Sequence, residues 1–494
     1  MKFRQAIYSS SEAVNEPLLV ELGQKAREQL LLTGLSGTAS ELDRALRRSS
    51  PLELPELSEL RVIRHYTRLS QMNYGVDCGT YPLGSCTMKY NPKLNDLIAQ
   101  FPGFADIHPG QSPETVQGAL EVLWSLESLL REITGLDAVS LQPAAGSQGE
   151  FTGMLITKAY FRDKGELGRR KQVLIPDTAH GSNFASAAMA GFEVVKVPSH
   201  DGETDIGSLE SLLSYRVAAF MVTVPNTLGI FERNVKHICE LVHDAGGLMY
   251  FDGANMNALN GVARPGDFGF DIAHLNLHKA FSTPHGGGGP GAGPVAVRSD
   301  LEDYLPGPRV KKRPDGTYSL ENGSEKSVGR VREGLGNFGV LLRAYFYIRA
   351  LGGDGLRQAT RDAVLTTNYA AKRVSERLAL PFGRDKRRKH EFVASARGSG
   401  KRALDIAKGV LGSGHAPTIY FPQIVEEALM IEFTESETKA EVDDYIDGLL
   451  GTLDRDLSLE PSTTSVARLD EADAARNPRL TWREVVEKKE NQAS

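Results

Sequence analysis

The stretch that decides the fold runs Asp271-Ile-Ala-His-Leu-Asn-Leu-His278-Lys279-Ala-Phe-Ser-Thr-Pro-His285 and continues into Gly286-Gly-Gly-Gly-Pro-Gly-Ala-Gly293. Its apolar residues Ile272, Leu275 and Leu277 predict a short buried strand that ends at His278-Lys279. Burying a lysine ammonium in a protein core is unfavourable. A lysine is tolerated there if its amine forms a covalent bond, as in a Schiff base. We therefore expect Lys279 to be a reactive residue.

The glycine-rich run after Lys279 is a poor match to nucleotide-binding loops. It contains the pattern G-x-G-x-x-G at Gly286, Gly288 and Gly291, but Pro290 interrupts it. A strand-like segment, Pro294-Val-Ala-Val297, follows where a helix is required. The run also lacks the Gly-Lys-Ser/Thr ending of a P-loop. We expect it to allow close backbone packing, against a cofactor or a partner chain.

Upstream of Lys279, short apolar segments alternate with helix-like segments. The segments predicted as strands are 138–141, 173–176, 193–197, 217–224 and 248–251. This alternation predicts an α/β fold with a mainly parallel sheet that is covered on both faces. Ligands of such sheets bind outside the carboxyl ends of the strands. The turns after these segments carry Gly146, Ser147, His180, Asn226 and Asp252.

The bulk composition limits the class of protein. The chain has 494 residues, a formal net charge of -6 and 24% charged residues, which argues against nucleic acid and anionic membranes as partners. No apolar run is long enough to cross a bilayer, and no secretory signal is visible. The three cysteines, Cys78, Cys86 and Cys239, form neither a disulfide framework nor a zinc pattern. We expect a cytoplasmic enzyme.

Four regions are predicted along the chain. They are an N-terminal helical arm (1–65), a large cofactor-binding α/β domain (66–335), a smaller C-terminal α+β domain (336–451) and a polar tail (452–494).

Single elements are also predicted within these regions. Ser112-Pro113-Glu114 has the composition of a helix start and Gly135 that of a helix end, so one long core helix is expected between them. Segments 417–421 and 428–433 are expected to pair as strands, and the basic run 385–390 is expected to be a solvated loop.

The residues at the predicted strand ends match the needs of pyridoxal phosphate. Its phosphate needs backbone N–H donors, and Gly146, Ser147 and Gln148 stand at a predicted helix N-terminus. Its ring nitrogen must stay protonated, which a carboxylate at Asp252 favours. The first predicted contacts are therefore to the phosphate and to the ring nitrogen.

The remaining predicted contacts concern the ring face, the ring hydroxyl and the aldehyde. His180 can stack on the ring, and Asn226 can donate to the hydroxyl. Lys279 follows Asp252 by 27 residues (279 − 252 = 27), enough for one crossover and the next strand. We predict that Lys279 carries pyridoxal phosphate, with Ala254 and His278 as neighbouring contacts.

A metal site is the alternative use of the histidines in this region. His274, His278 and His285 lie close together in the sequence. No acidic or cysteine partner completes a ligand set in the sequence around them, so no metal is predicted.

Several long motifs are spread over nearly the whole chain. They are Tyr81-Pro-Leu-Gly-Ser-Cys-Thr-Met-Lys89, Gln142-Pro-Ala-Ala-Gly-Ser-Gln-Gly-Glu150, Ala179-His-Gly-Ser-Asn183, Phe251-Asp-Gly-Ala-Asn-Met256, Asn276-Leu-His-Lys279 with the following Ser282–Gly291, Gly336-Asn-Phe-Gly339 and Pro417-Thr-Ile-Tyr-Phe-Pro422. They resemble the motifs of glycine decarboxylase, the P-protein of the glycine cleavage system. The length resembles subunit 2 of the split bacterial form.

The resemblance implies a fold, a reaction and partners. The fold would be that of a fold-type I pyridoxal-phosphate enzyme, with the cofactor on Lys279. The reaction would release CO2 from glycine and transfer the aminomethyl group to the lipoyl group of H-protein. Ser85 and Thr87 would contact the glycine carboxylate. The family's second P-protein subunit, subunit 1, implies a heterotetramer.

Some positions depart from the family's pattern. Ala280 stands for a usual Thr, Gly334-Leu335 stands where an aromatic is expected, and Phe433 replaces a usual Pro. The first removes a hydroxyl near the cofactor, and none removes a group that the chemistry requires.

Two alternative functions stay open from the sequence. One is another fold-type I pyridoxal-phosphate enzyme, such as an amino-acid decarboxylase or an aminotransferase, because a fold does not fix an activity. The other is a non-catalytic scaffold subunit. The joint presence of Lys279, Asp252 and His180 argues against a scaffold.

Overall fold

The computed structural model describes residues 16–25, 44–46, 48–50, 54–55, 57–284, 291–464, 468, 470–481 and 483–484. The chain divides into two compact units: one comprises Met1–Gly79, Lys408–His415 and Asp456–Ser494, and the other comprises Thr80–Ala407 and Ala416–Arg455. The candidate site lies in the second unit. The prediction for 285–290, which includes His285 and most of the glycine run, falls outside the described residues.

The first unit contains α1 (Leu19–Lys25), α2 (Glu59–Met72) and α14 (Glu471–Arg476). A buried carboxylate, Glu16, ties the segment before α1 to α2. Its oxygens lie 3.1 Å from His65 Nδ1 and 3.3 Å from an Arg68 side-chain nitrogen. Because the two partners stand three residues apart on one helix, a single acid can reach both.

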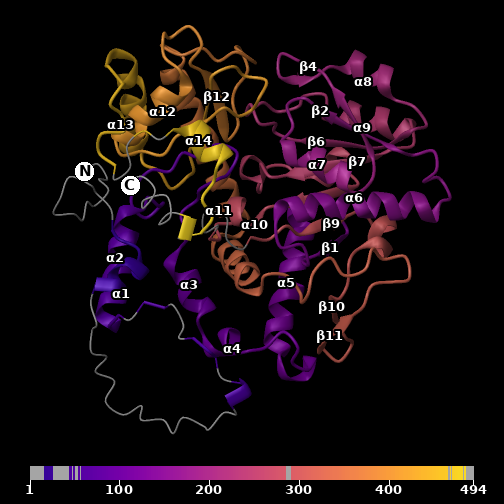
Figure 1. Ribbon diagram of the computed structural model, residues 1–494. Helices are drawn as coiled ribbons and strands as arrows, with labels where there is room; N and C mark the ends of the chain where they lie inside the picture. The colour runs from indigo at the N-terminus through magenta and orange to yellow at the C-terminus, as the bar shows by residue number, and fades with distance from the viewer. Residues whose placement is uncertain are drawn as a thin grey trace. The chain divides into compact units, whose positions relative to one another are not determined.

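A seven-stranded sheet forms the centre of the second unit, in the order β1-β9-β8-β7-β6-β2-β3 (Figure 1). The strands are β1 (Ala138–Ser140), β2 (Gln172–Pro176), β3 (Glu193–Val197), β6 (Val217–Thr223), β7 (Leu248–Gly253), β8 (Ile272–Leu275) and β9 (Val295–Val297). Neighbours from β3 to β8 pair in parallel, and β9 pairs antiparallel with β8 and with β1. The predicted mainly parallel sheet is confirmed.

Helices cover both faces of this sheet. They are α5 (Gln117–Thr134), α6 (Gly146–Asp163), α7 (Gly181–Met189), α8 (Ile206–Leu212) and α9 (Val235–Asp244). Strand β7 shows the alternation behind this arrangement: Met249 and Phe251 pack in one hydrophobic cluster, with α5, α8 and α9, while Leu248 and Tyr250 pack in the other, with α6 and α7. All four side chains are buried, as expected for a sheet covered on both sides.

The remaining strands form smaller sheets. The small C-terminal sheet has the order β12-β14-β13, with β12 (Glu391–Ser395), β13 (Thr418–Ile419) and β14 (Ala428–Glu432). The predicted pairing of segments 417–421 and 428–433 is confirmed as β13 with β14. Two further pairs are β4 (Ser199–His200) with β5 (Glu203–Thr204), and β10 (Arg309–Lys312) with β11 (Tyr318–Glu321).

The other helices are α3 (Lys93–Ala99), α4 (Pro102–Ala105), α10 (Leu277–Ala280), α11 (Phe338–Val374), α12 (Ala403–Gly412) and α13 (Lys439–Gly451). The longest of them, α11, is interrupted at Gly352, whose backbone has φ 62° and ψ -174°. This conformation is available almost only to glycine. Gly352 therefore separates α11 into two helical halves.

The structure corrects three local predictions. The long core helix ends at Gly135 as predicted, with φ 68°, but it begins at Gln117. Residues Pro113–Thr115 form a separate 3-10 turn, because Val116 leaves helical geometry with φ -129°. The basic run 385–390 is a loop, but its Arg388 and His390 are buried and not solvated.

The third correction concerns Lys279. The predicted strand ends at Leu275, and Leu277–Ala280 forms one helical turn, α10. The Asn276 carbonyl accepts hydrogen bonds from the backbone N–H groups of Lys279 and Ala280 at 3.0 and 3.3 Å, which closes this turn. Lys279 thus lies just beyond the strand end and not in the strand.

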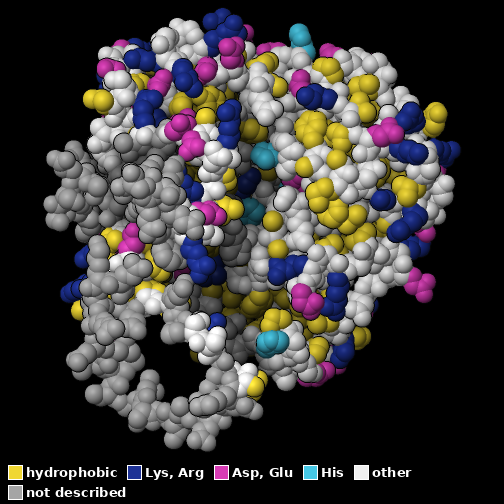
Figure 2. Space-filling model, in the orientation of Figure 1, with side chains coloured by type: hydrophobic (Ala, Val, Ile, Leu, Met, Phe, Trp, Pro, Cys, Tyr) yellow, Lys and Arg dark blue, Asp and Glu magenta, His cyan; other side chains and the backbone are white. Residues whose placement is uncertain are grey.

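Charge and hydropathy of the described residues agree with the bulk composition. Basic and acidic side chains are mixed across the face of the molecule in Figure 2. None of the helices in the described part of the chain has both the length and the hydropathy that a membrane span requires. Cys78, Cys86 and Cys239 are all free.

Candidate active site

A cavity of about 250 Å³ lies where the central strands end. The structure brings together there eight of the predicted site residues: Ser85, Gly146, Ser147, His180, Asp252, Ala254, His278 and Lys279. The loops after β1, β2, β7 and β8 supply most of them. The cavity therefore lies where a parallel sheet is expected to bind its ligand.

The amine of Lys279 reaches this cavity from α10. Its Nζ donates a hydrogen bond of 2.7 Å to the backbone carbonyl of Ser85, 194 residues earlier in the chain. Ser85 has φ 67°, a left-handed conformation that is unusual for a residue other than glycine. A strained residue thus accepts the hydrogen bond of Lys279, and strained residues are typical of functional sites.

Asp252 is a buried carboxylate that faces the cavity. It accepts hydrogen bonds from Asn183 Nδ2 at 3.0 Å, Thr223 Oγ1 at 3.0 Å and the Ala254 N–H at 2.9 Å. Burial would raise its pKa, but the hydrogen bonds from Asn183 and the Ala254 N–H, together with the charge of Lys279, hold the pKa below its ordinary value. Asp252 is therefore an anion although only 1% of its surface is exposed.

Strand register lines up the groups around Asp252. Thr223 on β6, Asp252 on β7 and His274 on β8 are direct register partners. His274 Nε2 lies 3.3 Å from Asp252 Oδ1, and its Nδ1 lies 2.8 Å from the hydroxyl of Tyr250. Burial lowers the pKa of His274, which leaves its ring neutral. Register thus creates a polar row across three otherwise apolar strands.

Glu150 on α6 is a cavity residue that the sequence reasoning did not single out. It accepts hydrogen bonds from Ser182 Oγ at 2.8 Å and Ser186 Oγ at 3.1 Å. Burial and the charge of Asp252 raise its pKa to about 7. Glu150, Asp252 and His274 have polar atoms within 4.8 Å of one another, so the premise that no acidic residue accompanies His274 is corrected.

The N-terminus of α6 forms another wall. The first N–H groups of a helix have no partner within the helix, and Gly146 and Ser147 present theirs beside the cavity. A Cβ atom on Gly146 would lie 2.2 Å from Asn276 Oδ1. Glycine at this position allows α6 to approach Asn276, which also lines the cavity.

His180 lies at the exposed edge of the cavity as the N-cap of α7. Its Nδ1 accepts a hydrogen bond of 3.1 Å from the Ser182 N–H. Its ring lies 5.1 Å from the ring of Phe421 at a tilt of 53°. One face of the imidazole is thus supported by an aromatic ring from the loop after β13.

Three predicted contacts are not brought to the cavity. Gln148, predicted as a backbone N–H donor, does not line the cavity, and its side chain accepts from the Ala144 N–H and donates to the Val331 carbonyl. The Asn226 side chain donates to the Gly202 carbonyl and accepts from two N–H groups of its own turn. Thr87 is buried and donates to Glu432. Each side chain is held by partners elsewhere.

Several cavity residues were missed by the sequence reasoning. They are Ala145, Glu150, Ser182, Thr223, Thr227, Asn255 and Asn276. Thr223 could have been found, since it ends the strand next to that of Asp252. Others are oriented by distant segments: Thr227, for example, donates to the Thr178 carbonyl at 2.6 Å.

The departures from the family's pattern do not line the cavity. Ala280 is buried in a hydrophobic cluster. Phe433 is buried against Tyr445, with ring centroids 5.6 Å apart. Gly334 has φ 75°, which suits glycine better than any other residue.

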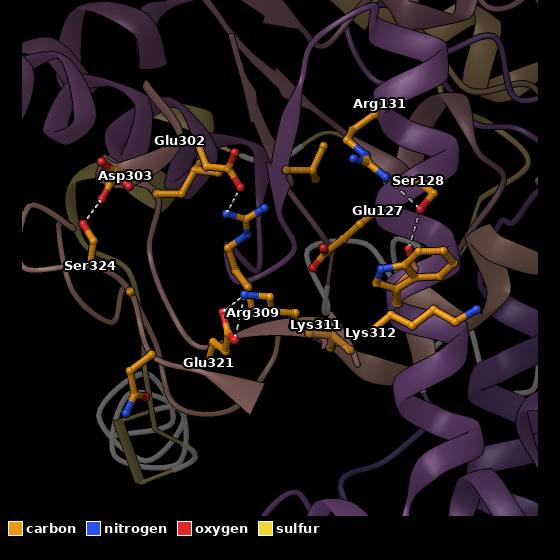
Figure 3. Close-up of a pocket in the computed structure, with 16 residues that line it drawn as sticks. Glu127, Ser128, Arg131, Glu302, Asp303, Arg309, Lys311, Lys312, Glu321 and Ser324 are labelled. Atoms are coloured by element: carbon orange, nitrogen blue, oxygen red, sulfur yellow. Dashed lines mark hydrogen bonds and ion pairs between the residues drawn. The ribbon is translucent and has the colours of Figure 1, made fainter. Parts of the chain in front are cut away.

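A larger cavity of about 610 Å³ lies elsewhere, between α5 and the β10–β11 hairpin (Figure 3). Four of the charged groups drawn there pair with each other: Arg309 with Glu302 at 2.9 Å, and Lys311 with Glu321 at 3.0 Å. Glu127 from α5 points toward this cavity, and burial raises its pKa to about 8. The cavity lacks the amine and carboxylate pair of Lys279 and Asp252.

Solved structures resemble the whole fold. A crystal structure titled "glycine decarboxylase (P-protein) of the glycine cleavage system, in inhibitor-bound form" superposes with a TM-score of 0.69 at 20% identity. It matches over 90% of this chain and 100% of its own. A cysteine desulfurase from Thermococcus onnurineus has a TM-score of 0.60 at 15% identity, over 76% of this chain and 95% of its own. Fold and site together define a fold-type I pyridoxal-phosphate enzyme.

Sequence comparisons identify the family. The model of the glycine cleavage system P-protein matches residues 24–317, and that of the glycine dehydrogenase C-terminal domain matches residues 359–462. The chain belongs to the glycine cleavage system P-protein family. A "Probable glycine dehydrogenase (decarboxylating) subunit 2" from Pyrococcus abyssi is 51% identical over 96% of this chain and 97% of its own. A protein of the same name from Thermoplasma volcanium is 51% identical over 98% of this chain and 100% of its own.

Proposed function

We propose that this chain decarboxylates glycine and passes the aminomethyl group to the lipoyl group of H-protein, with pyridoxal phosphate bound to Lys279. The observation that carries the proposal is one cavity that holds a primary amine, Lys279, and a buried ionised carboxylate, Asp252. Relatives about half identical over nearly the full chain bear the name glycine dehydrogenase (decarboxylating) subunit 2.

The residues fit the cofactor on structural grounds. Asp252 is an anion in a core, and among the described residues no lysine or arginine forms an ion pair with it. A cationic ring nitrogen would supply the missing positive charge. The N–H groups of Gly146 and Ser147 at the start of α6 suit a phosphate. Lys279 supplies the amine that anchors the cofactor.

Each residue then has a defined task. When bound, pyridoxal phosphate supplies the electron sink for the electron pair that remains after CO2 leaves. Asp252 holds a proton on the ring nitrogen, and its contacts with Thr223, Asn183 and His274 fix its carboxylate. His180 covers one face of the cavity. Lys279 is placed to hold or move a proton once glycine has displaced its amine.

The proposed assembly contains further chains. We place this protein in the cytoplasm as one half of a heterotetramer with subunit 1, acting on lipoylated H-protein. The word "subunit" in the relatives' names and three free cysteines support this proposal. The predicted contacts of Ser85 with the glycine carboxylate and of Ala254 and His278 with the cofactor belong to the same proposal.

Spectroscopy tests the proposal directly. The assembled protein with cofactor should absorb in the near-ultraviolet to violet, and Lys279→Ala should abolish that band. Glycine-dependent exchange of bicarbonate should require both H-protein and the partner subunit. Robust transamination without either partner would instead identify an aminotransferase. An unchanged band in Lys279→Ala would refute the assignment of the lysine.

A further inference from the structure

Two buried glutamates lie directly behind the wall of the candidate active site. Glu391 begins β12 and Glu432 ends β14, and the antiparallel register places them opposite each other. Their exposed fractions are 0% and 2%. One oxygen of each and one ring nitrogen of His390 lie within 4.8 Å of one another. Two like charges opposite each other on antiparallel strands repel.

The surroundings do not neutralise two negative charges. Among the described residues, no lysine or arginine forms an ion pair with either carboxyl group. His390 is fully buried, with Nε2 3.5 Å from Glu391 Oε1. Neither of its ring nitrogens has a hydrogen-bond partner in the described part of the chain, and burial lowers its pKa to about 3. Its ring is therefore neutral at physiological pH and adds no positive charge.

Titratable groups from two other segments face the pair. Lys279 on α10 and Lys89 on the segment 82–89 favour its ionisation from a distance, but Lys89 already forms an ion pair with Glu435 at 3.1 Å. Cys86 on the same segment faces Glu432, and burial raises the pKa of its thiol, which keeps it neutral. Two distant cations thus face a pair of carboxyl groups that lie close together.

Hydrogen bonds connect the pair to the cavity wall. Glu391 Oε2 accepts from the Ser85 N–H at 2.9 Å, and its Oε1 lies 3.3 Å from Asn255 Nδ2. Glu432 Oε1 accepts from the Thr87 hydroxyl, while its Oε2 is buried and has no partner in the described part of the chain. An unpartnered buried oxygen is unfavourable as part of an anion and can carry a proton.

We propose that Glu391 and Glu432 share one proton at neutral pH and, in that state, hold Ser85 where its carbonyl accepts the hydrogen bond of Lys279. They are positioning residues, because they act on the lysine through Ser85. The inference deepens the proposed function and rests on Lys279 being the cofactor lysine. Its structural basis is the pair of contacts that Ser85 makes, N–H to Glu391 and carbonyl from Lys279.

The backbone of Ser85 explains why such a support is needed. Its φ of 67° is unfavourable for serine. The preceding residues are held by β14: Leu83 forms a bridge with Ile431, and the Glu432 N–H donates to the Pro82 carbonyl at 3.2 Å. Sheet pairing and the carboxyl pair together fix the strained turn beside Lys279.

Loss of the shared proton should release this support. Burial raises the pKa of Glu432 to about 7, and burial together with the charge of Glu432 raises the pKa of Glu391 well above its ordinary value. The pair titrates as a unit. Above its second ionisation, two negative charges face each other, and the Ser85 segment is pushed away from Lys279.

The experiment compares Glu391→Gln, Glu432→Gln and wild type in the assembled holoenzyme. Infrared spectra at neutral pH should show a protonated carboxylic acid in wild type whose signal is weaker in both variants, since each variant lacks one of the two carboxyl groups that share this proton. In wild type, raising the pH should remove this acid signal, and the Lys279-dependent absorption band should change over the same pH range. In each variant, the alkaline midpoint of that band should move up by at least one pH unit. Glu426→Gln is the matched control, because Glu426 is exposed and paired with Arg397.

Three results would overturn the inference. One is an infrared acid signal that is as strong in both variants as in wild type. Another is an alkaline midpoint in both variants equal to that of wild type. The third is a stoichiometric divalent ion in the purified protein that both substitutions remove. A wild-type holoenzyme without any Lys279-dependent band would instead refute the proposed function, which separates the two failures.

Discussion

Asp252 is the residue whose charge the proposed chemistry needs most. In Asp252→Asn the side chain keeps its shape but loses the negative charge that pairs with the ring nitrogen. We expect glycine-dependent bicarbonate exchange to fall by roughly 10²–10³-fold, the size of loss typical of removing one preorganised electrostatic group. Cofactor absorption should remain, since Lys279 is intact. Activity within threefold of wild type would contradict the assigned role.

Gly146 is predicted to be required for a steric reason. An added Cβ would lie 2.2 Å from Asn276 Oδ1, so Gly146→Ala must displace Asn276 or the start of α6. We expect cofactor affinity, measured by absorbance titration, to fall by at least roughly tenfold, because small displacements at a binding site have large effects. Adding Asn276→Ala should restore part of the affinity.

Gly118, the second residue of α5, provides the control for this substitution. A Cβ atom there would meet nothing within 4 Å, so Gly118→Ala should bind cofactor as wild type does.

Additive effects of Gly146→Ala and Asn276→Ala on cofactor affinity would contradict the prediction, because they would show that the two positions do not contact each other.

At the scale of single residues, the sequence predicted the reactive groups of the cavity better than the hydrogen-bond partners of single side chains. Lys279, Asp252 and His180 follow strands of one sheet, and the rule for strand ends brings them together. Gln148 was assigned as a backbone donor at a helix N-terminus, Asn226 by its place after a strand, and Thr87 by the family resemblance. Their side chains instead bond to Val331, Gly202 and Glu432, and no local pattern reveals such partners.

At the scale of elements, α5 carries a buried acid that makes stability depend on pH. Burial raises the pKa of Glu127 from an ordinary 4.5 to about 8, although Arg309 and Arg131 lower it. Between these values the unfolded chain releases the proton that the folded chain keeps. Stability should therefore fall as pH rises through this window, by up to roughly 1.4 kcal/mol per pH unit.

Denaturant unfolding between pH 5 and 8 checks this prediction. The free energy of unfolding should depend less steeply on pH in Glu127→Gln than in wild type. Glu121→Gln, at an exposed position of the same helix, should keep the wild-type slope. Equal slopes in all three proteins would show that Glu127 is ionised in the folded state.

The break in α11 predicts opposite behaviour for two adjacent glycines. Gly352 has φ 62°, so Gly352→Ala should destabilise the protein by roughly 1–3 kcal/mol. Gly353 lies in the helix with open space around it, so Gly353→Ala should be neutral or stabilising by up to about 1 kcal/mol. Thermal unfolding of both variants measures the difference, and equal Tm values would contradict the assigned break.

Element boundaries were the weaker part of the sequence reasoning. Leu277 continues the apolar alternation of β8, yet it begins the helical turn of α10, because hydrogen bonds to Asn276 outweigh the pattern. Strand β12 was not predicted, because it begins with the fully buried Glu391, next to the buried His390. A charged residue in a core strand is hidden from an argument based on hydropathy alone.

At the scale of the whole molecule, the family predicted from the motifs is confirmed, and the assembly becomes the main question. One chain has a mass of 53.8 kDa, so two copies contribute 107.6 kDa (2 × 53.8) to the proposed heterotetramer. Native mass spectrometry of co-expressed subunits should find two copies of each. A fully active complex made of this chain alone would contradict the proposal.

The row formed by Thr223, Asp252 and His274 makes the candidate active site depend on correct strand pairing. These residues share one face only because β6, β7 and β8 pair in a single alignment. A slip of β7 by one position would turn its acid toward the opposite helical layer and its apolar neighbours toward the ligand. Molecules with this mispairing would thus be inactive as well as less stable. After dilution from denaturant, the fraction of cofactor absorbance that is recovered would then report the fraction of molecules whose central strands have paired correctly.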